Sequence, residues 1–255
     1  MRKIYVIGLG SGNPDHMTIQ AIKALNKVDV FFMIDKGAAA SELIDVREEI
    51  CRRFIENSDY RVVRAHNPER DARSADYRHG VEEWHKARAA IFEDLIRDEL
   101  EADECGAFLV WGDPALYDST IRILQRVLAQ QNVSFEYEVI PGISSAQALA
   151  AVHKIPLNNI GEAVHITTGR KFAEGRTGDA ESILVMLDGE NSFRAAPAAN
   201  STIYWGAYLG MPDETIIAGP LEEVADQIEE VRRNLRQKKG WIMDIYLLKQ
   251  ERDDA

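Results

Sequence analysis

The sequence predicts an α/β protein of two domains, the first with a mostly parallel sheet and the second with a mixed sheet. Short apolar strands alternate with amphipathic helices over residues 1–139, which is the pattern of βαβ units. From residue 140 the connections shorten and strands follow one another with few helices, which favours mixed or antiparallel pairing. The 255 residues are enough for two domains with a core each. We therefore divide the chain into residues 1–139 and 140–255.

In the first domain, apolar runs and helical periodicity define the expected elements in order. We expect strands at residues 4–7, 28–34, 60–64, 107–111 and 135–140, and helices at 18–26, 41–54 and 81–100. A further helix follows residues 118–120, where Asp118, Ser119 or Thr120 can cap it. Residues 65–80 form a long polar connection. Its arginines and the one before it could bind substrate carboxylates, although acidic neighbours favour a solvated loop: Arg64, Arg70, Arg73 and Arg78.

In the second domain the pattern predicts helices at residues 146–152 and 221–237. Strands are expected at 163–167, 183–187, 202–206, 215–217 and 241–248. Ser144 and Ser145 stand where hydroxyls usually cap a helix.

The net charge is −12, from 30 basic and 42 acidic residues, and argues against nucleic-acid or anionic-membrane binding. We find no apolar run of membrane-spanning length and no signal peptide, so we expect a cytoplasmic protein without a membrane partner. Cys51 and Cys105 lie far apart without metal-ligand spacing, and neither a disulfide framework nor a metal site is expected.

Residues 8–14, Gly-Leu-Gly-Ser-Gly-Asn-Pro, are similar to the glycine turn of dinucleotide-binding domains. Asn13 occupies the position of the last glycine in that fingerprint, and Pro14 delays the following helix. A nicotinamide cofactor is therefore disfavoured.

Gly112-Asp113-Pro114 lies at the carboxyl end of an apolar strand, where open α/β sheets bind their ligands. We expect Asp113 to project a carboxylate that suits a cationic or hydroxyl-bearing ligand better than a phosphate. Taken alone, these three residues could equally be an ordinary turn.

Five strings together resemble the tetrapyrrole methylase family across nearly the whole chain. They are Ile-Gly-Leu-Gly-Ser-Gly-Asn-Pro at 7–14, Gly-Asp-Pro-Ala-Leu-Tyr at 112–117, Ile-Pro-Gly-Ile-Ser-Ser at 140–145, His-Lys-Ile-Pro-Leu at 153–157 and Val-Met-Leu at 185–187. Ser11 departs from the family, which commonly has proline there, so the resemblance does not predict the conformation of the first loop.

The resemblance implies a two-domain fold with an active-site cleft between the domains, a homodimer, S-adenosylmethionine as methyl donor and a corrinoid precursor as substrate. Four further strings, at residues 29–37, 108–114, 205–210 and 240–244, are similar to one corrinoid branch of the family. That branch implies methylation of precorrin-5 at ring carbon 1 with loss of the ring-bound acetyl group as acetate.

Residue by residue, the resemblance implies a donor site made of Gly112, Asp113, Pro114, Leu116, Ser144, Ser145, Met186 and Ala207. Asp113 and Tyr117 are the candidate catalytic residues, while His16, Asp118 and His153 also lie on or near the site turns. For the substrate we select Ser11, which borders the tetrapyrrole site, and the cations Arg170 and Lys171. We assign no residue as the base that activates water for acetyl loss.

Three alternatives remain at this stage. The protein could methylate another position of a uroporphyrin or corrin ring without deacetylation. It could be a nicotinamide oxidoreductase built on the Gly8 turn, or a tetrapyrrole carrier that binds no methyl donor.

Overall fold

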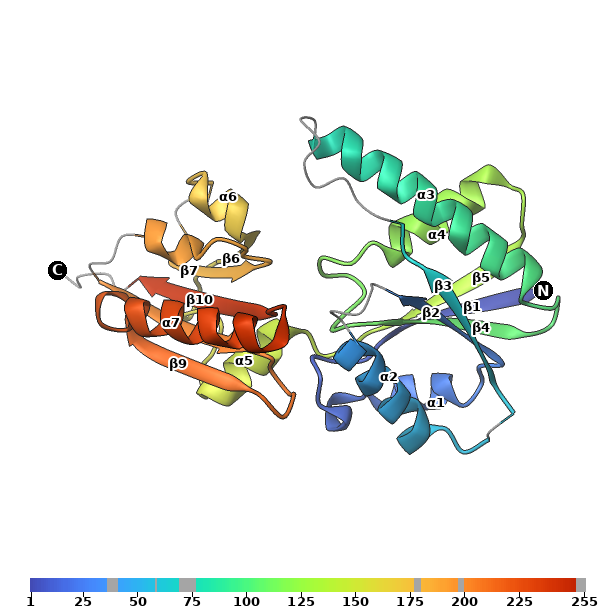
Figure 1. The fold of residues 1–255 in the computed structure, drawn as a ribbon, viewed down its shortest axis with the longest axis horizontal. Helices are drawn as coiled ribbons and strands as arrows, with labels where there is room; N and C mark the ends of the chain where they lie inside the picture. Colours follow the sequence, from blue (N-terminus) through green and yellow to red (C-terminus); the bar gives the residue numbers. More distant parts are fainter. Residues whose placement is uncertain (36–40, 58, 69–76, 177–179, 197–199, 251–255) are drawn as a thin grey trace. The chain divides into compact units, whose positions relative to one another are not determined.

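The computed structural model describes residues 1–35, 41–57, 59–68, 77–176, 180–196 and 200–250 (Figure 1). Residues 36 and 37, at the end of the string 29–37, and the candidate arginines Arg70 and Arg73 lie outside these ranges. The chain forms two compact units. The first comprises Met1–Gly10 and Pro14–Ile143, and the second comprises Ser11–Asn13 and Ser144–Ala255.

The first unit is built on a five-stranded sheet of order β3-β2-β4-β1-β5, with every pairing parallel. Its strands are β1 (Arg2–Gly8), β2 (Val30–Asp35), β3 (Arg61–His66), β4 (Cys105–Val110) and β5 (Phe135–Ile140). The predicted parallel sheet is confirmed. Because all strands run the same way, the segments that follow them emerge at one edge of the sheet.

Helices cover both faces of this sheet (Figure 1). They are α1 (Ile19–Leu25), α2 (Ser41–Phe54), α3 (Tyr77–Asp98) and α4 (Thr120–Gln130), with a 3₁₀ turn, η1, at Pro14–His16. In β1, Ile4 and Val6 pack under α3 and α4, whereas Tyr5 and Ile7 pack under α1 and α2. This alternation follows from the two-residue period of a strand, and each fully buried apolar side chain stabilises the fold by about 1.5–3 kcal/mol.

The second unit contains a mixed five-stranded sheet of order β6-β7-β10-β8-β9. Its strands are β6 (Val164–Thr168), β7 (Ser182–Met186), β8 (Ser201–Ala207), β9 (Thr215–Pro220) and β10 (Asp244–Gln250). Within this second sheet, only β6 and β7 are paired in parallel among the described strands, which confirms the predicted mixed sheet.

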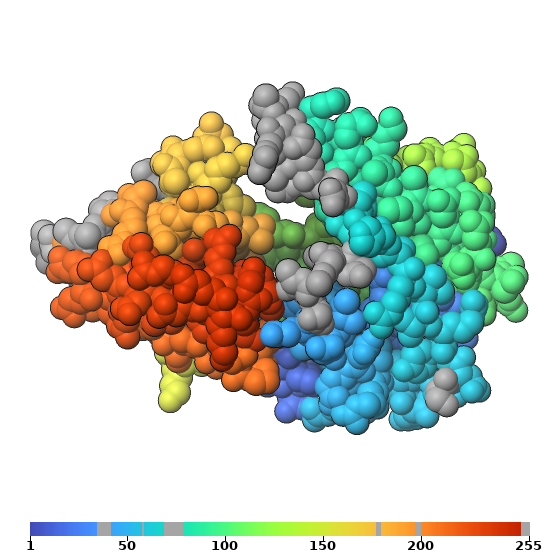
Figure 2. Space-filling model, in the orientation of Figure 1, coloured from blue at the N-terminus to red at the C-terminus, as the bar shows by residue number. Residues whose placement is uncertain are grey.

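One face of the second sheet packs against α5 (Ser145–His153) through Ala146, Ala148 and Leu149. The opposite face, marked by Tyr246, contacts Phe172 of α6 (Gly169–Ala173) and Phe193 of the 3₁₀ turn η3 (Ser192–Ala195). The long helix α7 (Leu221–Lys239) forms much of the visible surface of this unit (Figure 2). In the described part of the chain, no helix is both long and apolar enough to cross a membrane.

Several element boundaries differ from the prediction, and two short helices were not predicted. Helix α3 begins at Tyr77, inside the predicted loop 65–80. Strand β10 begins at Asp244 rather than at 241, because the backbone carbonyls of Trp241 and Met243 accept hydrogen bonds from Tyr208 instead of a strand partner. The short helices α6 and η3 were not predicted, since five and four residues are too few to show a helical period.

Candidate active site

Three glycines meet where β1, β4 and β5 end. A Cβ atom on Gly8 would lie 2.6 Å from the Gly142 nitrogen and 2.9 Å from the Gly112 oxygen. A Cβ atom on Gly142 would lie only 2.1 Å from that same oxygen. Gly10 and Gly112 also exchange backbone hydrogen bonds of 2.8 and 3.2 Å. The three turns can therefore approach one another only because these positions carry no side chain.

Asp113 joins two of these turns. Its Oδ1 accepts a hydrogen bond of 2.8 Å from the Ala115 nitrogen, and its Oδ2 accepts one of 2.9 Å from the Gly142 nitrogen. Both oxygens of the carboxylate thus bind backbone groups, and a ligand would have to use their remaining lone pairs. Asp113 holds the turn after β4 against the turn after β5.

Three of the predicted donor-site residues are each followed directly by a residue whose backbone is left-handed. Tyr117 (φ 52°) follows Leu116, Leu187 (φ 53°) follows Met186, and Tyr208 (φ 51°) follows Ala207. A bulky residue in this region costs about 1–3 kcal/mol, and such residues gather at functional sites. Leu187 also leaves 67% of its surface exposed, although it is apolar.

In the second unit, Ser144 caps α5 as its sequence position predicts. Its hydroxyl accepts a hydrogen bond of 3.2 Å from the Ala146 nitrogen, and Gln147 Oε1 accepts one of 3.0 Å from the Ser144 nitrogen. Met186 packs against the α5 face of the sheet, opposite Ile245 of β10. Ala207 is opposite Asp244 on the other side of β10, so Met186 and Ala207 lie close to the same edge of the sheet.

A buried ionic network supports this edge. Asp244 Oδ2 accepts hydrogen bonds from Arg232 Nε at 2.8 Å and from Trp205 Nε1 at 3.0 Å. Arg232 also donates to the backbone oxygen of Asp188, whose carboxylate accepts from Tyr246 at 2.9 Å. Burial raises the pKa of Asp244, whereas Arg232 and Trp205 oppose that shift. The network links α7, β8 and β10 with the segment after β7.

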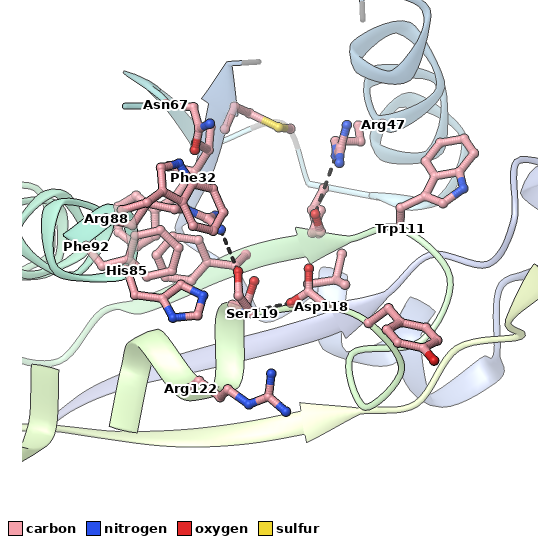
Figure 3. A pocket seen from close by; sticks show the side chains of 18 of the residues that line it. Phe32, Arg47, Asn67, His85, Arg88, Phe92, Trp111, Asp118, Ser119 and Arg122 are labelled. Atoms are coloured by element: carbon pink, nitrogen blue, oxygen red, sulfur yellow. Dashed lines mark hydrogen bonds between the residues drawn. The ribbon is translucent and has the colours of Figure 1, made fainter. Parts of the chain in front are cut away.

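The first unit also contains a cavity of about 530 Å³. Its walls come from β2, β4, α2, α3 and the segment that leads into α4 (Figure 3). Among its described lining residues, the charged groups are four arginines and one carboxylate, namely Arg47, Arg64, Arg88, Arg122 and Asp118. The cavity is therefore locally basic in a chain whose net charge is −12.

Arg88 is the most buried of these arginines, with 7% of its surface exposed. Its guanidinium lies over the rings of Trp84 and Phe92 at 4.8 and 5.3 Å, and its Nη1 donates to Ser119 Oγ at 2.7 Å (Figure 3). Its Nε is buried and has no hydrogen-bond partner in the described structure. Burial lowers the pKa of Arg88, and Asp118 opposes that shift.

Arg47 approaches the cavity from α2 (Figure 3). Its Nη1 donates to the Leu43 oxygen at 2.8 Å. Asp118 Oδ1 accepts a hydrogen bond of 2.7 Å from the Thr120 nitrogen, whereas Ser119 occupies the N-cap position of α4. Ser119 makes no capping bond because its hydroxyl faces Arg88.

Comparison with known proteins identifies the family of this chain. The family model of tetrapyrrole (corrin/porphyrin) methylases matches residues 3–225. The chain belongs to this family. The resemblance inferred from the glycine turns is thereby confirmed.

One relative and two solved structures each cover almost the whole methylase chain. A precorrin-6A synthase [deacetylating] of Sinorhizobium sp is 52% identical over 99% of this chain and 97% of its own. The crystal structure of a putative cobalamin synthesis related protein (CobF) from Corynebacterium diphtheriae is 36% identical, with a TM-score of 0.84 over 98% of this chain and 99% of its own. The Thermus thermophilus uroporphyrin-III C-methyl transferase, solved with S-adenosyl homocysteine, is 18% identical over 97% of this chain and 92% of its own, with a TM-score of 0.59, and shares the fold.

The other predicted site residues of this methylase do not all line the cavity. Tyr117 lines the cavity and is 45% exposed, whereas Asp113 is not among the described lining residues. Ser11 is buried, with 1% of its surface exposed. Arg170 lies on α6, and Lys171 on the same helix pairs with Glu174 at 3.3 Å.

Two further site candidates from the sequence, Arg64 and His153, make contacts within the protein. Arg64 lines the cavity and forms an ion pair with Glu48. His153 Nε2 lies 3.1 Å from the Trp205 oxygen, which is a structural contact. Within the described ranges no group of three or more His, Cys, Asp or Glu side chains could hold a metal ion.

Sequence reasoning missed Arg47 and Arg88. The signal for Arg88 was present, because Trp84, Arg88 and Phe92 recur at intervals of four residues on α3. An arginine on the apolar stripe of a helix is a candidate for burial, and hence for binding an anion.

Proposed function

We propose that this methylase converts precorrin-5 to precorrin-6A by methylating ring carbon 1 and releasing the acetyl group as acetate. The observation that carries the proposal is the 52% identity to the Sinorhizobium precorrin-6A synthase over nearly the full length of both chains. The basic cavity of the first unit supports it, because a corrinoid precursor carries many carboxylates.

We further propose S-adenosylmethionine as the methyl donor. The proposed residues are Gly112, Asp113, Pro114, Leu116, Ser144, Ser145, Met186 and Ala207. The glycine turns and the left-handed residues after Leu116, Met186 and Ala207 support this role, because strained backbone of this kind gathers at functional sites. When bound, the donor supplies a methyl group activated by a sulfonium centre.

Methyl transfer requires mainly alignment of the donor with the carbon nucleophile. Asp113 supplies the rigidity in this proposal, because it ties the turns after β4 and β5 together. No covalent enzyme intermediate is needed.

Loss of the acetyl group needs a second set of interactions. Water adds to the acetyl carbonyl, the carbon–carbon bond breaks, acetate leaves, and the bond electrons remain on the ring carbon that accepts the methyl group. Burial raises the pKa of Tyr117, so its hydroxyl stays protonated at neutral pH and can donate to the oxyanion that forms at the carbonyl. Ser11, Arg170 and Lys171 remain proposed substrate contacts. The proposal also includes a cytoplasmic homodimer, as in the family.

Calorimetric titration of the purified protein with S-adenosylmethionine, and separately with oxidised and reduced nicotinamide dinucleotides, tests the proposed donor. We expect binding of S-adenosylmethionine alone. Binding of a nicotinamide dinucleotide without S-adenosylmethionine would contradict the proposal and revive the dinucleotide interpretation of the Gly8 turn.

A further inference from the structure

The cavity of the first unit contains a buried cation whose hydrogen-bonding capacity is only partly used. Arg88 Nη1 binds Ser119, but Nε is buried without a partner among the described residues. No carboxylate of the described chain lies within ion-pair distance of this guanidinium. A buried charged group with an unsatisfied donor is unfavourable, which makes Arg88 a candidate for binding a ligand.

The surroundings hold the guanidinium in one orientation. Trp84 and Phe92 contact it as π faces, and the Ser119 hydroxyl fixes Nη1 (Figure 3). A guanidinium fixed in this way is preorganised for side-on binding of a planar carboxylate, which accepts two parallel hydrogen bonds. The Ser119 hydroxyl accepts from Nη1 and can donate its own hydrogen to the same ligand.

The charge balance of the cavity selects an anion. The described lining contains Arg47, Arg64 and Arg122 besides Arg88, against the single carboxylate of Asp118. Asp118 itself already accepts a hydrogen bond from the Thr120 backbone nitrogen. Aromatic side chains on the same walls, including Trp111 and Phe32, suit the apolar part of an organic anion better than inorganic phosphate.

We propose that Arg88 and Ser119 form a subsite for an alkyl carboxylate in this cavity. The ligand is either a side-chain carboxylate of the tetrapyrrole or the acetate that the reaction releases. The identity of the carboxylate rests on the proposed function, whereas the subsite itself rests on the geometry of the cavity.

The test uses uroporphyrin III, a porphyrin with eight carboxylates, as a probe whose binding quenches tryptophan fluorescence. Arg88→Met removes the guanidinium but keeps an unbranched side chain, and Arg126→Met is the matched control. Arg126 lies on α4, pairs with Glu82 and is not among the described residues that line the cavity. We expect Arg88→Met to weaken uroporphyrin binding by about tenfold to a hundredfold, and Arg126→Met by less than about twofold.

Stability and donor binding separate a binding role from a structural role. Because Arg88 is a buried cation without a carboxylate partner, we expect Arg88→Met to unfold at the wild-type temperature or above it. We also expect it to bind S-adenosylmethionine as the wild type does. Equal uroporphyrin affinity in the wild type and Arg88→Met would overturn the subsite, as would equal losses in Arg88→Met and Arg126→Met.

If Arg88→Met does not fold, Ser119→Ala decides. It removes only the hydroxyl that orients the guanidinium, and we expect about threefold to tenfold weaker uroporphyrin binding. Unchanged affinity in Ser119→Ala would reject the proposal in that case.

Competition with sodium acetate identifies the source of the carboxylate. Acetate that displaces uroporphyrin from the wild type, but not the weakly bound uroporphyrin from Arg88→Met, assigns the subsite to the released acetate. Uroporphyrin binding that depends on Arg88 and resists acetate assigns it to a side chain of the ring. Acetate release from precorrin-5 by the wild type tests the proposed function separately, because uroporphyrin binding requires no reaction.

Discussion

Asp113 illustrates how the role of a single residue changes between sequence and structure. Its place after an apolar strand predicts a carboxylate that faces a ligand. In the structure both carboxylate oxygens accept backbone hydrogen bonds, one within its own turn and one from Gly142. The sequence could not show the second bond, since the two residues are 29 positions apart.

Asp113→Asn should therefore weaken both the fold and the proposed donor site. The amide can accept only through its oxygen, so its NH₂ group would oppose a backbone N–H. We expect a loss of about 1–3 kcal/mol in the free energy of unfolding, measured with urea, together with weaker S-adenosylmethionine binding. Asp103→Asn, at an exposed residue, is the control. Wild-type stability and turnover in Asp113→Asn would refute the role assigned to Asp113.

Cys51 provides a pH prediction at the same scale. Burial raises the pKa of this thiol to about 12, with Glu48 contributing and Arg47 opposing. Only about one molecule in ten thousand would carry the thiolate at pH 8, and the thiolate is the reactive form. We expect the native protein to protect Cys51 from a disulfide reagent until it is unfolded. Peptide mapping after labelling measures this, and rapid labelling of native Cys51 at pH 8 would contradict the prediction.

The burial of Arg88 could not be predicted from the residue pattern of the helix alone. Helical periodicity places it between Trp84 and Phe92, but the same pattern fits an arginine whose stem covers apolar surface while its head reaches water. Only the packed structure distinguishes the two cases, by leaving 7% of Arg88 exposed.

At the scale of elements, the strands were the best predicted features. The sheet of the first unit buries alternate residues on two helix-covered faces, so its strands appear in the sequence as short apolar runs. The turns after them were found because glycine is required there. Gly142 is the sharpest case, since a Cβ atom would overlap the Gly112 oxygen.

Gly142→Ala should separate the turns after β4 and β5. A methyl group 2.1 Å from a backbone oxygen forces the strand ends apart, and we expect a loss of about 1–3 kcal/mol or more in unfolding free energy. Gly189→Ala is the matched control, because a Cβ there meets no described atom within 4 Å. Thermal unfolding of the two variants provides the comparison, and equal melting temperatures would contradict the close approach.

The ionic network of the second unit joins elements that no periodicity connects. Asp244→Ala would leave Arg232 buried beside Trp205 without its carboxylate. We expect a loss of about 3–5 kcal/mol by urea unfolding, as for other broken buried pairs. Asp226→Ala removes an exposed partner of Arg194 and should cost about 0–1 kcal/mol. Similar losses in the two variants would show that burial of the Asp244 pair has no special weight.

At the scale of the whole molecule, the sequence predicted the fold class and the family, because glycine turns and apolar strands extend over nearly its full length. It did not predict the basic cavity. That cavity depends on β2, β4, α2, α3 and the segment before α4 coming together, and these elements are separated in the sequence. Arginines on separate elements form one basic site only when the chain is folded.

The most direct test of the proposed function is incubation of the protein with precorrin-5 and S-adenosylmethionine labelled with ¹³C in its methyl group. Carbon NMR of the corrinoid and quantification of acetate follow the two half-reactions. We predict one labelled methyl group at ring carbon 1 and one acetate for each ring converted. Labelling of the ring without acetate would contradict the account and assign the protein to another methylation step.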